Sequence, residues 1–150
     1  MTTSQAGSLY GKVVLVTAGG SGIGRTIVEA YLALGAKVHT CDISQSMLDE
    51  CCSHNPELTT SVCDVSDEKQ VESLFDDFKN QYGHLDILVN NAGISGATAA
   101  IEDFEIDDWD RTIAVDLRGT FLVTRLAVPL LKQVGGGSII NMSSNAGLFG

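Results

Sequence analysis

The sequence predicts an α/β fold built on a parallel sheet. Short apolar runs rich in β-branched residues alternate with longer segments in which apolar residues recur every three or four positions. Glycines cluster directly after the first run, and acidic or amide residues follow the next three. Alternating strands and helices imply parallel strands joined by right-handed crossovers. Because the 150 residues contain no internal repeat and no linker, we expect one domain over 1–150, with a flexible lead-in at 1–11.

The first strand, a turn and a helix lie within Lys12–Leu34. The apolar run Val13–Val16 ends at Thr17, and glycines follow at positions 19, 20, 22 and 24. The next helix carries its apolar residues on one face, namely Ile23, Ile27, Ala30, Tyr31 and Leu34. A glycine turn lets backbone approach a phosphate closely, and the helix start offers free N–H groups and a positive dipole end. We therefore interpret this segment as a phosphate-binding turn.

Two kinds of phosphate-binding turn fit this segment unequally. Gly19–Thr26 (GGSGIGRT) nearly matches a P-loop, but Arg25 stands where that motif needs lysine. A dinucleotide-binding turn instead needs an acidic residue about 20 residues beyond the glycines. Asp42 ends the strand-like run Lys37–Asp42 and meets that requirement. The sequence therefore favours a dinucleotide-binding turn.

The alternation continues through the middle of the chain. Ser44 can cap a short helix that ends near Cys52, and Leu58–Cys63 is predicted to be a third strand that ends at Asp64. Ser66 is predicted to cap the next helix. The apolar residues of that helix fall on one face, namely Val71, Leu74, Phe75 and Phe78.

The fourth strand is predicted at Leu85–Val89, directly before Asn90-Asn91-Ala92-Gly93. The acidic stretch Glu102–Asp110 is typical of a solvated helix start, which we expect Trp109 to anchor by packing.

A long helical pattern then runs from Trp109 to about Val134. We expect a bend at Pro129, because proline removes a backbone donor. Three glycines at 135–137 end the helix, and Ser138–Met142 is predicted to be a fifth strand.

Composition excludes several classes of function. The formal net charge of -10 argues against nucleic acid as a partner, because phosphates call for a basic surface. No apolar stretch approaches a membrane span and the N-terminus lacks a signal-like apolar core, so we expect no membrane partner and a cytoplasmic location. The cysteines (41, 51, 52 and 63) and histidines (39, 54 and 84) lack metal-ligand spacing, so we expect reduced thiols and no metal.

With these segments in place, the sequence resembles the short-chain dehydrogenases/reductases from Lys12 almost throughout to Gly150. Five motifs carry the resemblance, in the family's order and spacing: Thr17–Gly24 (TAGGSGIG), Asp64-Val65, Asn90–Gly93 (NNAG), Trp109–Phe121 (WDRTIAVDLRGTF) and Gly137–Gly147 (GSIINMSSNAG). The resemblance implies a Rossmann-type, doubly wound parallel sheet with strand order 3-2-1-4-5. The family's sheet continues past a fifth strand, so we expect this chain to be a fragment, truncated after that strand.

The resemblance also implies an activity. Family members transfer a hydride between a nicotinamide cofactor and an alcohol or carbonyl carbon, so a small-molecule substrate is expected, and a homo-oligomer for a full-length form. The implied cofactor-binding residues are Thr17, Gly19, Ser21, Gly22, Ile23, Gly24, Asp42, Ile43, Asp64, Val65, Asn91, Ala92 and Gly93. The implied catalytic serine is Ser144, which would donate a hydrogen bond to the substrate oxygen with Ser143 in support. Asp116 stands at the position of the family's active-site asparagine.

Asp42 predicts NAD rather than NADP. A carboxylate accepts hydrogen bonds from both ribose hydroxyls of NAD, whereas a 2′-phosphate would place like charges together. At about 4 Å and an effective dielectric of ~20, such repulsion costs up to about 4 kcal/mol per charge pair. Ser21 and Ile43 supply no positive charge to offset it, although Arg25 is nearby.

Two residues depart from the family's motifs. Ala18 replaces the first glycine of the turn, which is compatible with binding if the position does not have a left-handed conformation. Asp116 keeps the shape of asparagine but loses its NH₂ donor. That change would interrupt a proton relay through the side chain, but not one through the backbone carbonyl.

The family's acid/base pair, a tyrosine followed four residues later by lysine, does not occur in the 150 residues. The tyrosines are 10, 31 and 82, and the residues four positions on are Val14, Gly35 and Asp86. General acid/base catalysis contributes typically about 10²–10⁴-fold. We therefore expect negligible activity from this chain alone, and the alternative interpretation is a non-catalytic NAD-binding or interaction module.

The fifth strand is also expected to lack cover. Without further strands and a helix beside it, Ile139–Met142 would form an exposed apolar edge. Leaving such side chains in water forfeits about 1.5–3 kcal/mol each. We therefore expect the 150-residue chain to be unstable or to self-associate.

Overall fold

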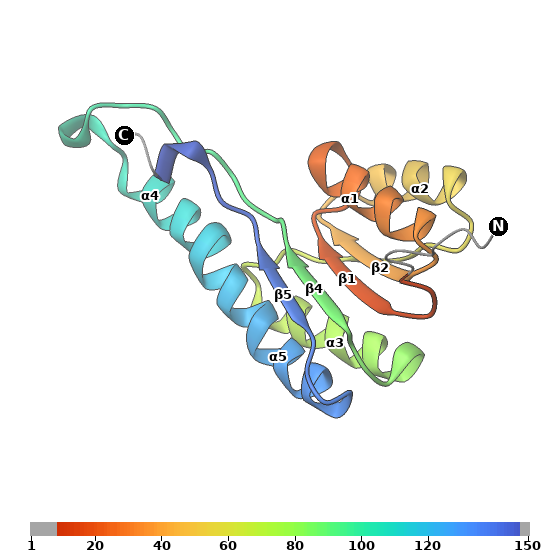
Figure 1. Ribbon diagram of the computed structural model, residues 1–150. Coiled ribbons are helices and arrows are strands. Elements are labelled where there is room, and N and C mark those ends of the chain that lie inside the picture. Colours follow the sequence, from red (N-terminus) through yellow and green to blue (C-terminus); the bar gives the residue numbers. More distant parts are fainter. Residues whose placement is uncertain (1–8, 148–150) are drawn as a thin grey trace.

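The computed structural model describes residues 9–147, in which five parallel strands form one sheet (Figure 1). The strands are β1 (Val13–Thr17), β2 (Lys37–Asp42), β3 (Thr59–Val62), β4 (Ile87–Asn90) and β5 (Ser138–Asn141). Their order in the sheet is β3-β2-β1-β4-β5, and every neighbouring pair is parallel. The predicted fold class and strand order are confirmed.

Helices cover both faces of this sheet. On one face lie α1 (Gly22–Ala33) and α2 (Gln45–His54), and on the other lie α3 (Glu68–Tyr82) and α5 (Thr120–Gln133) (Figure 1). Between β4 and α5 the chain forms a 3-10 turn η1 (Ile101–Asp103), the short helix α4 (Ile106–Thr112) and a π-helical stretch η2 (Ile113–Gly119). A second 3-10 turn, η3 (Asn145–Gly147), follows β5.

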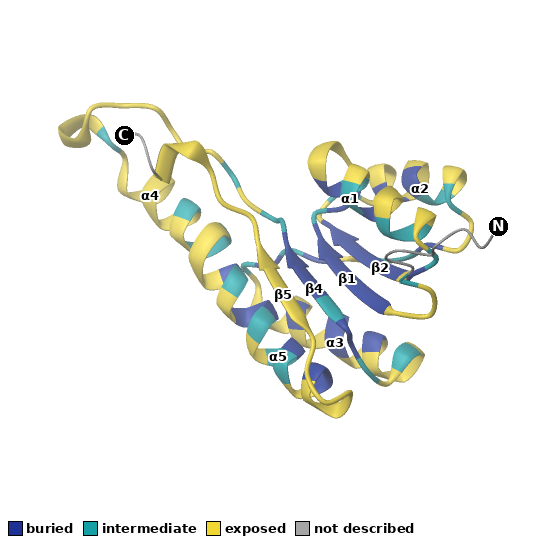
Figure 2. Cartoon of the chain, in the orientation of Figure 1, coloured by how far each residue is buried: buried dark blue, intermediate teal, exposed yellow. Residues whose placement is uncertain are grey.

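The centre of the sheet is far better buried than its β5 edge. Every residue of β1 is exposed by 1% or less, with apolar clusters packed on both faces. All four residues of β5 are exposed (Figure 2). The apolar side chains of Ile139, Ile140 and Met142 are 39%, 41% and 44% exposed. The predicted exposed apolar edge is therefore confirmed.

Asp86 directly precedes β4 and joins this strand to β1 and β5 at the end of the sheet where the strands begin. Its carboxylate accepts hydrogen bonds from Lys12 Nζ at 2.8 Å and from the Val13 N–H at 2.9 Å. Its backbone carbonyl accepts the Ser138 N–H at 3.0 Å. Burial opposes ionisation of the Asp86 carboxyl, but the hydrogen bonds from Lys12 and Val13 outweigh it and hold the pKa of this carboxyl below its usual value.

The start of α3 differs from the prediction. The capping residue is Asp67 rather than Ser66, because the Asp67 carboxylate accepts the N–H groups of Lys69 and Gln70. The Ser66 hydroxyl donates instead to Asp64 at 2.7 Å. The predicted apolar face of this helix is buried, as expected.

The long helical segment also differs from the prediction. It begins at Ile106, and Trp109 is 53% exposed, so this indole does not anchor the helix by packing. Pro129 lies inside α5, while the departure from α-helical hydrogen bonding occurs earlier, in η2. At the end of η2, Gly119 packs closely against Val65, where a Cβ would lie 2.8 Å from a Val65 methyl carbon.

Part of the predicted flexible lead-in, residues 1–8, lies outside the described residues. The remainder is tied to the end of α1, since Leu9 N–H donates to Leu34 carbonyl and Gly11 N–H to Gly35 carbonyl, each at 3.1 Å.

Ala18, directly after β1, has a left-handed backbone conformation, with φ of 54°. It is the one non-glycine residue with positive φ in the described part of the chain. We expected alanine at this position to be compatible with cofactor binding if its φ lay outside the left-handed region, but the structure places its φ inside that region. An L-residue held in that region costs about 1–2 kcal/mol, which glycine avoids.

A buried polar network joins β2 to β3 and α3. His39 is 2% exposed, and its ring nitrogens lie 2.7 Å from Thr59 Oγ1 and 3.1 Å from Ser61 Oγ. Thr59 Oγ1 in turn lies 2.6 Å from the Tyr82 hydroxyl. Burial lowers the pKa of His39 from 6.5 to about 4, against a small opposing effect of the Asp77 charge.

Replacement of Ala18 by glycine tests the strain after β1. We expect Ala18→Gly to raise the free energy of unfolding by about 1 kcal/mol, because relief of the left-handed strain exceeds the entropy that glycine adds to the unfolded chain. Denaturant unfolding followed by circular dichroism measures the change. Ala30→Gly, at an exposed position inside α1, is the control and should destabilise by about 1 kcal/mol. Loss of stability in Ala18→Gly would contradict the expectation.

His39 predicts a loss of stability in mild acid. The unfolded chain takes up a proton near pH 6.5, whereas the folded chain keeps His39 neutral down to about pH 4. The unfolded state therefore binds more protons in this window, and stability falls as the pH drops through it, by up to about 3 kcal/mol. Urea unfolding from pH 8 to pH 4 measures the slope. The dependence of stability on pH should flatten in His39→Gln. It should persist in His54→Gln, because His54 is exposed in the folded chain.

Candidate dinucleotide-binding site

The loops that follow β1 and β4 are tied together at the carboxyl edge of the sheet. The Thr17 hydroxyl oxygen accepts the backbone N–H groups of Asn91 at 3.0 Å and Ala92 at 2.9 Å. The Asn91 side-chain amide donates to the carbonyls of Thr17 and Ala18, both at 3.1 Å. Since β1 and β4 are neighbours whose crossovers lead to opposite faces, this junction is where an open α/β sheet binds ligands.

The glycines of the turn are required by close contacts. A Cβ on Gly24 would overlap the Ala18 carbonyl oxygen, and one on Gly19 would overlap the Thr40 hydroxyl. Gly22 has φ of 54° and open space around it. Ser21 caps α1 without a side-chain hydrogen bond, which leaves the first N–H groups of this helix without a side-chain acceptor. The turn thus presents bare backbone and a helix N-terminus, which together suit an anion.

Asp42 lies beside this turn with both carboxylate oxygens held. One oxygen accepts the Gly20 N–H and the other accepts the Ser44 N–H, each at 3.1 Å. Asp42 is 8% exposed and forms part of the wall of a cavity. Arg25, the nearby cation, is already paired with Glu29 at 3.0 Å and with Glu50 at 2.9 Å.

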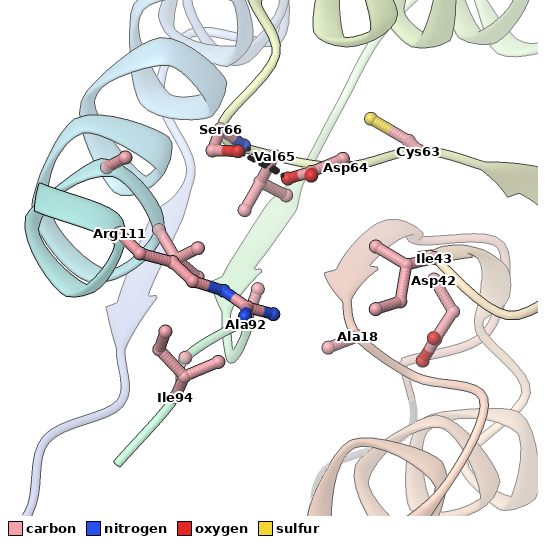
Figure 3. Close-up of a pocket in the computed structure, with 13 residues that line it drawn as sticks. Ala18, Asp42, Ile43, Cys63, Asp64, Val65, Ser66, Ala92, Ile94 and Arg111 are labelled. Atoms are coloured by element: carbon pink, nitrogen blue, oxygen red, sulfur yellow. Dashed lines mark hydrogen bonds between the residues drawn. The ribbon is translucent and has the colours of Figure 1, made fainter. Parts of the chain in front are cut away.

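The cavity, of about 290 Å³, lies between the turn and the segment from α4 to η2 (Figure 3). Its volume is at the lower end of the range for small-molecule sites. Six of the residues predicted to bind cofactor line it, namely Asp42, Ile43, Asp64, Val65, Ala92 and Gly93. The other predicted cofactor residues belong to the turn or to the junction below it rather than to the cavity wall, namely Thr17, Gly19, Ser21, Gly22, Ile23, Gly24 and Asn91.

The cavity is also lined by seven residues that were not among the predicted cofactor-binding residues, namely Ala18, Cys63, Ser66, Ile94, Arg111, Ala114 and Val115. Of these, Arg111, Ala114 and Val115 are spaced three and four apart, as expected of one helix face. That spacing is the signal by which they could have been found. Ser66 belongs to a turn in which the Asp64 carboxylate accepts its N–H at 2.9 Å.

The two predicted catalytic positions lie apart from the cavity wall. Ser144 is exposed after β5, where its hydroxyl oxygen accepts the Ala146 N–H at 3.2 Å, and Ser143 beside it is also exposed. Asp116 lies in η2, and its carboxylate accepts the Ile94 N–H at 2.8 Å. That contact needs only an acceptor, which aspartate supplies as well as asparagine. Asp116 therefore fixes the loop after β4 despite the lost NH₂ group.

Within residues 9–147, no three histidine, cysteine or acidic side chains are grouped so that they could hold a metal ion. No helix in the same part of the chain combines the length and the apolar character needed to cross a membrane.

Comparison with known proteins shows the same family over most of the chain. The family model for short chain dehydrogenase matches residues 12–150. A tropinone reductase homolog of Arabidopsis thaliana is 43% identical over 146 residues, which cover 94% of this chain and 54% of the relative. The levodione reductase of Leifsonia aquatica is 34% identical over 155 residues, which cover 99% of this chain and 58% of the relative.

Two solved structures show the same similarity in fold. A crystal structure of levodione reductase superposes with a TM-score of 0.88 at 34% identity, covering 94% of this chain and 57% of that one. A 3-ketoacyl-ACP reductase from Sinorhizobium meliloti gives 0.82 at 43% identity, covering 88% and 53%. The chain spans about half the length of these relatives. In sequence and in fold, the chain belongs to the short-chain dehydrogenase/reductase family.

Proposed function

We propose that this chain binds NAD along the carboxyl edge of its sheet, as the cofactor-binding part of an oxidoreductase that acts on an alcohol or carbonyl compound. The observation that carries the proposal is the Asp42 carboxylate, held by the Gly20 amide in the wall of the cavity beside the glycine turn. A ribose seated there meets a fixed acceptor.

The arrangement around Asp42 favours NAD over NADP. A 2′-phosphate would meet this carboxylate at close range, which is unfavourable in a partly buried site. Arg25 is engaged by Glu29 and Glu50, so its charge is largely balanced before any ligand arrives. The neutral hydroxyls of an unphosphorylated ribose suit the carboxylate as hydrogen-bond donors.

The turn suits the diphosphate of the same cofactor. Bare glycine backbone and the uncapped first turn of α1 offer N–H groups where a side chain would obstruct them. When bound, the nicotinamide ring would supply or accept the hydride. On the protein side, the Ser144 hydroxyl would donate a hydrogen bond to the substrate oxygen, and Asp116 would hold the loop at Ile94 in place.

The names of related proteins support the substrate class. Levodione reductase and D-threitol dehydrogenase, the latter 36% identical over 142 residues, are named for reduction of a ketone and oxidation of a polyol. These chains are about twice as long as this one. The hydride-transfer activity is accordingly proposed for the enzyme as a whole, and cofactor binding for the chain itself.

Truncation of Asp42 tests both cofactor identity and the position of the site. We expect Asp42→Ala to weaken NAD binding at least about 10-fold, because charge-assisted hydrogen bonds to the ribose are lost. NADP affinity should rise or remain unchanged, because the like charge is removed. Titration calorimetry with each cofactor measures both, and thermal unfolding checks that the variant is folded.

Asp49→Ala is the matched control, since Asp49 is exposed on the neighbouring helix α2. Its NAD affinity should equal that of the wild type. An Asp42→Ala variant that binds NAD as tightly as the wild type would rule out the proposed ribose contact, and a folded wild-type chain that binds neither cofactor would rule out the proposed function.

A further inference from the structure

Arg111 is the cation in the wall of the cavity. The charged residues of that wall are Asp42, Asp64 and Arg111. Both aspartates accept hydrogen bonds from nearby backbone amides, which satisfies part of their capacity. The cavity of a chain with formal net charge -10 thus carries one positive side chain among its lining residues. A ligand that brings negative charge would find its counter-charge there.

No ion pair or hydrogen bond within the described residues occupies the Arg111 guanidinium. The other three arginines, Arg25, Arg118 and Arg125, are each paired with a glutamate. Arg111 has acidic neighbours at the helical spacings that favour pairing, Asp107 and Asp108, yet neither forms an ion pair with it. Because the Arg111 guanidinium forms no ion pair with these neighbours and lines the cavity, it is available to a ligand.

The direction of the Arg111 side chain agrees with its availability to a ligand in the cavity. Figure 3 shows the guanidinium extending from α4 into the space between that helix and the segment that carries Ala18 and Asp42. Ala18 belongs to the glycine turn, on the other side of which α1 begins with uncapped N–H groups. A phosphate group that extended from the turn into the cavity at Ala18 would enter the space toward which the guanidinium points.

We propose that Arg111 is a cofactor-binding residue, whose guanidinium pairs with the diphosphate of the dinucleotide from the α4 side of the cavity. The inference rests on the proposed function and extends it, because the backbone of the turn alone would hold the diphosphate from one side. The planar fork of arginine suits two phosphate oxygens at once, which lysine does not reproduce. The bound diphosphate would thereby link α4 to the turn after β1.

The test compares ligands that contain or lack the diphosphate. We expect Arg111→Gln to weaken binding of NAD and of ADP-ribose at least about 10-fold, since a charged hydrogen bond is lost. Binding of adenosine, which has no phosphate, should change less than about twofold, within the scatter expected of a distant surface change. Calorimetry serves for NAD and ADP-ribose, and chemical-shift titration for adenosine. The wild-type affinity for NAD should also fall more steeply with added salt than that of Arg111→Gln.

Two variants serve as controls. Arg111→Lys keeps the charge without the fork and should give an intermediate loss. Arg125→Gln removes an exposed arginine of α5 that pairs with Glu68 outside the cavity, and it should bind NAD as the wild type does.

Three results would overturn the inference. Unchanged NAD affinity in Arg111→Gln, with binding by the wild type intact, would refute the role of Arg111 and leave the proposed function standing. An equal loss for adenosine and NAD would place the guanidinium against the adenine instead of the diphosphate. A folded wild-type chain that binds no NAD would refute the proposed function and this inference together.

Discussion

The hydrogen bonds between the loops after β1 and β4 hold the candidate site together. The Thr17 hydroxyl accepts hydrogen bonds from two backbone N–H groups, and the Asn91 side-chain amide donates to two backbone carbonyls. These contacts fix Ala18, whose carbonyl oxygen in turn leaves no room for a side chain on Gly24. The start of α1 and its position against the sheet follow from that contact. The position of the helix N-terminus against the loop after β1 is therefore set by side chains of both central loops.

An acidic protein that binds an anionic ligand needs local sources of positive potential. The structure contains two kinds, the uncapped N-terminus of α1 and the guanidinium of Arg111. Arg25, although closer in sequence to the glycines, is balanced by two glutamates. In the proposed complex, Asp42 would add negative charge beside the ribose. The site would thus attract a diphosphate while rejecting a further phosphate on the ribose, so that charge placement rather than net charge governs selectivity.

Periodicity was sufficient to predict all five strands and the buried face of α3, because burial on a sheet imposes those patterns directly. The order of the strands in the sheet was predicted from the family resemblance instead. Features that depend on contacts between distant segments were missed. Ser66 and Asp67 are both capable caps, and the turn at Asp64 decides between them. The left-handed Ala18 is held by Asn91, far along the chain. Trp109 and Arg111 share a short helix, and only its placement beside the cavity determines that Arg111 lines the cavity while Trp109 does not.

Within the 150-residue chain, the residues proposed to bind cofactor and the serine proposed to act on substrate follow strands of unequal burial. The residues proposed to contact the ribose and the diphosphate follow strands at the interior of the sheet, whereas the loop that carries Ser144 follows β5, which is exposed throughout in this chain. Local opening of an edge strand requires less free energy than opening of a central one. Fraying at β5 would displace the serine hydroxyl while the cofactor pocket stayed formed. Hydrogen exchange of the backbone amides would then show strong protection in β1 and weak protection in β5. Ligand could fill the cofactor pocket even in molecules whose Ser144 loop is open.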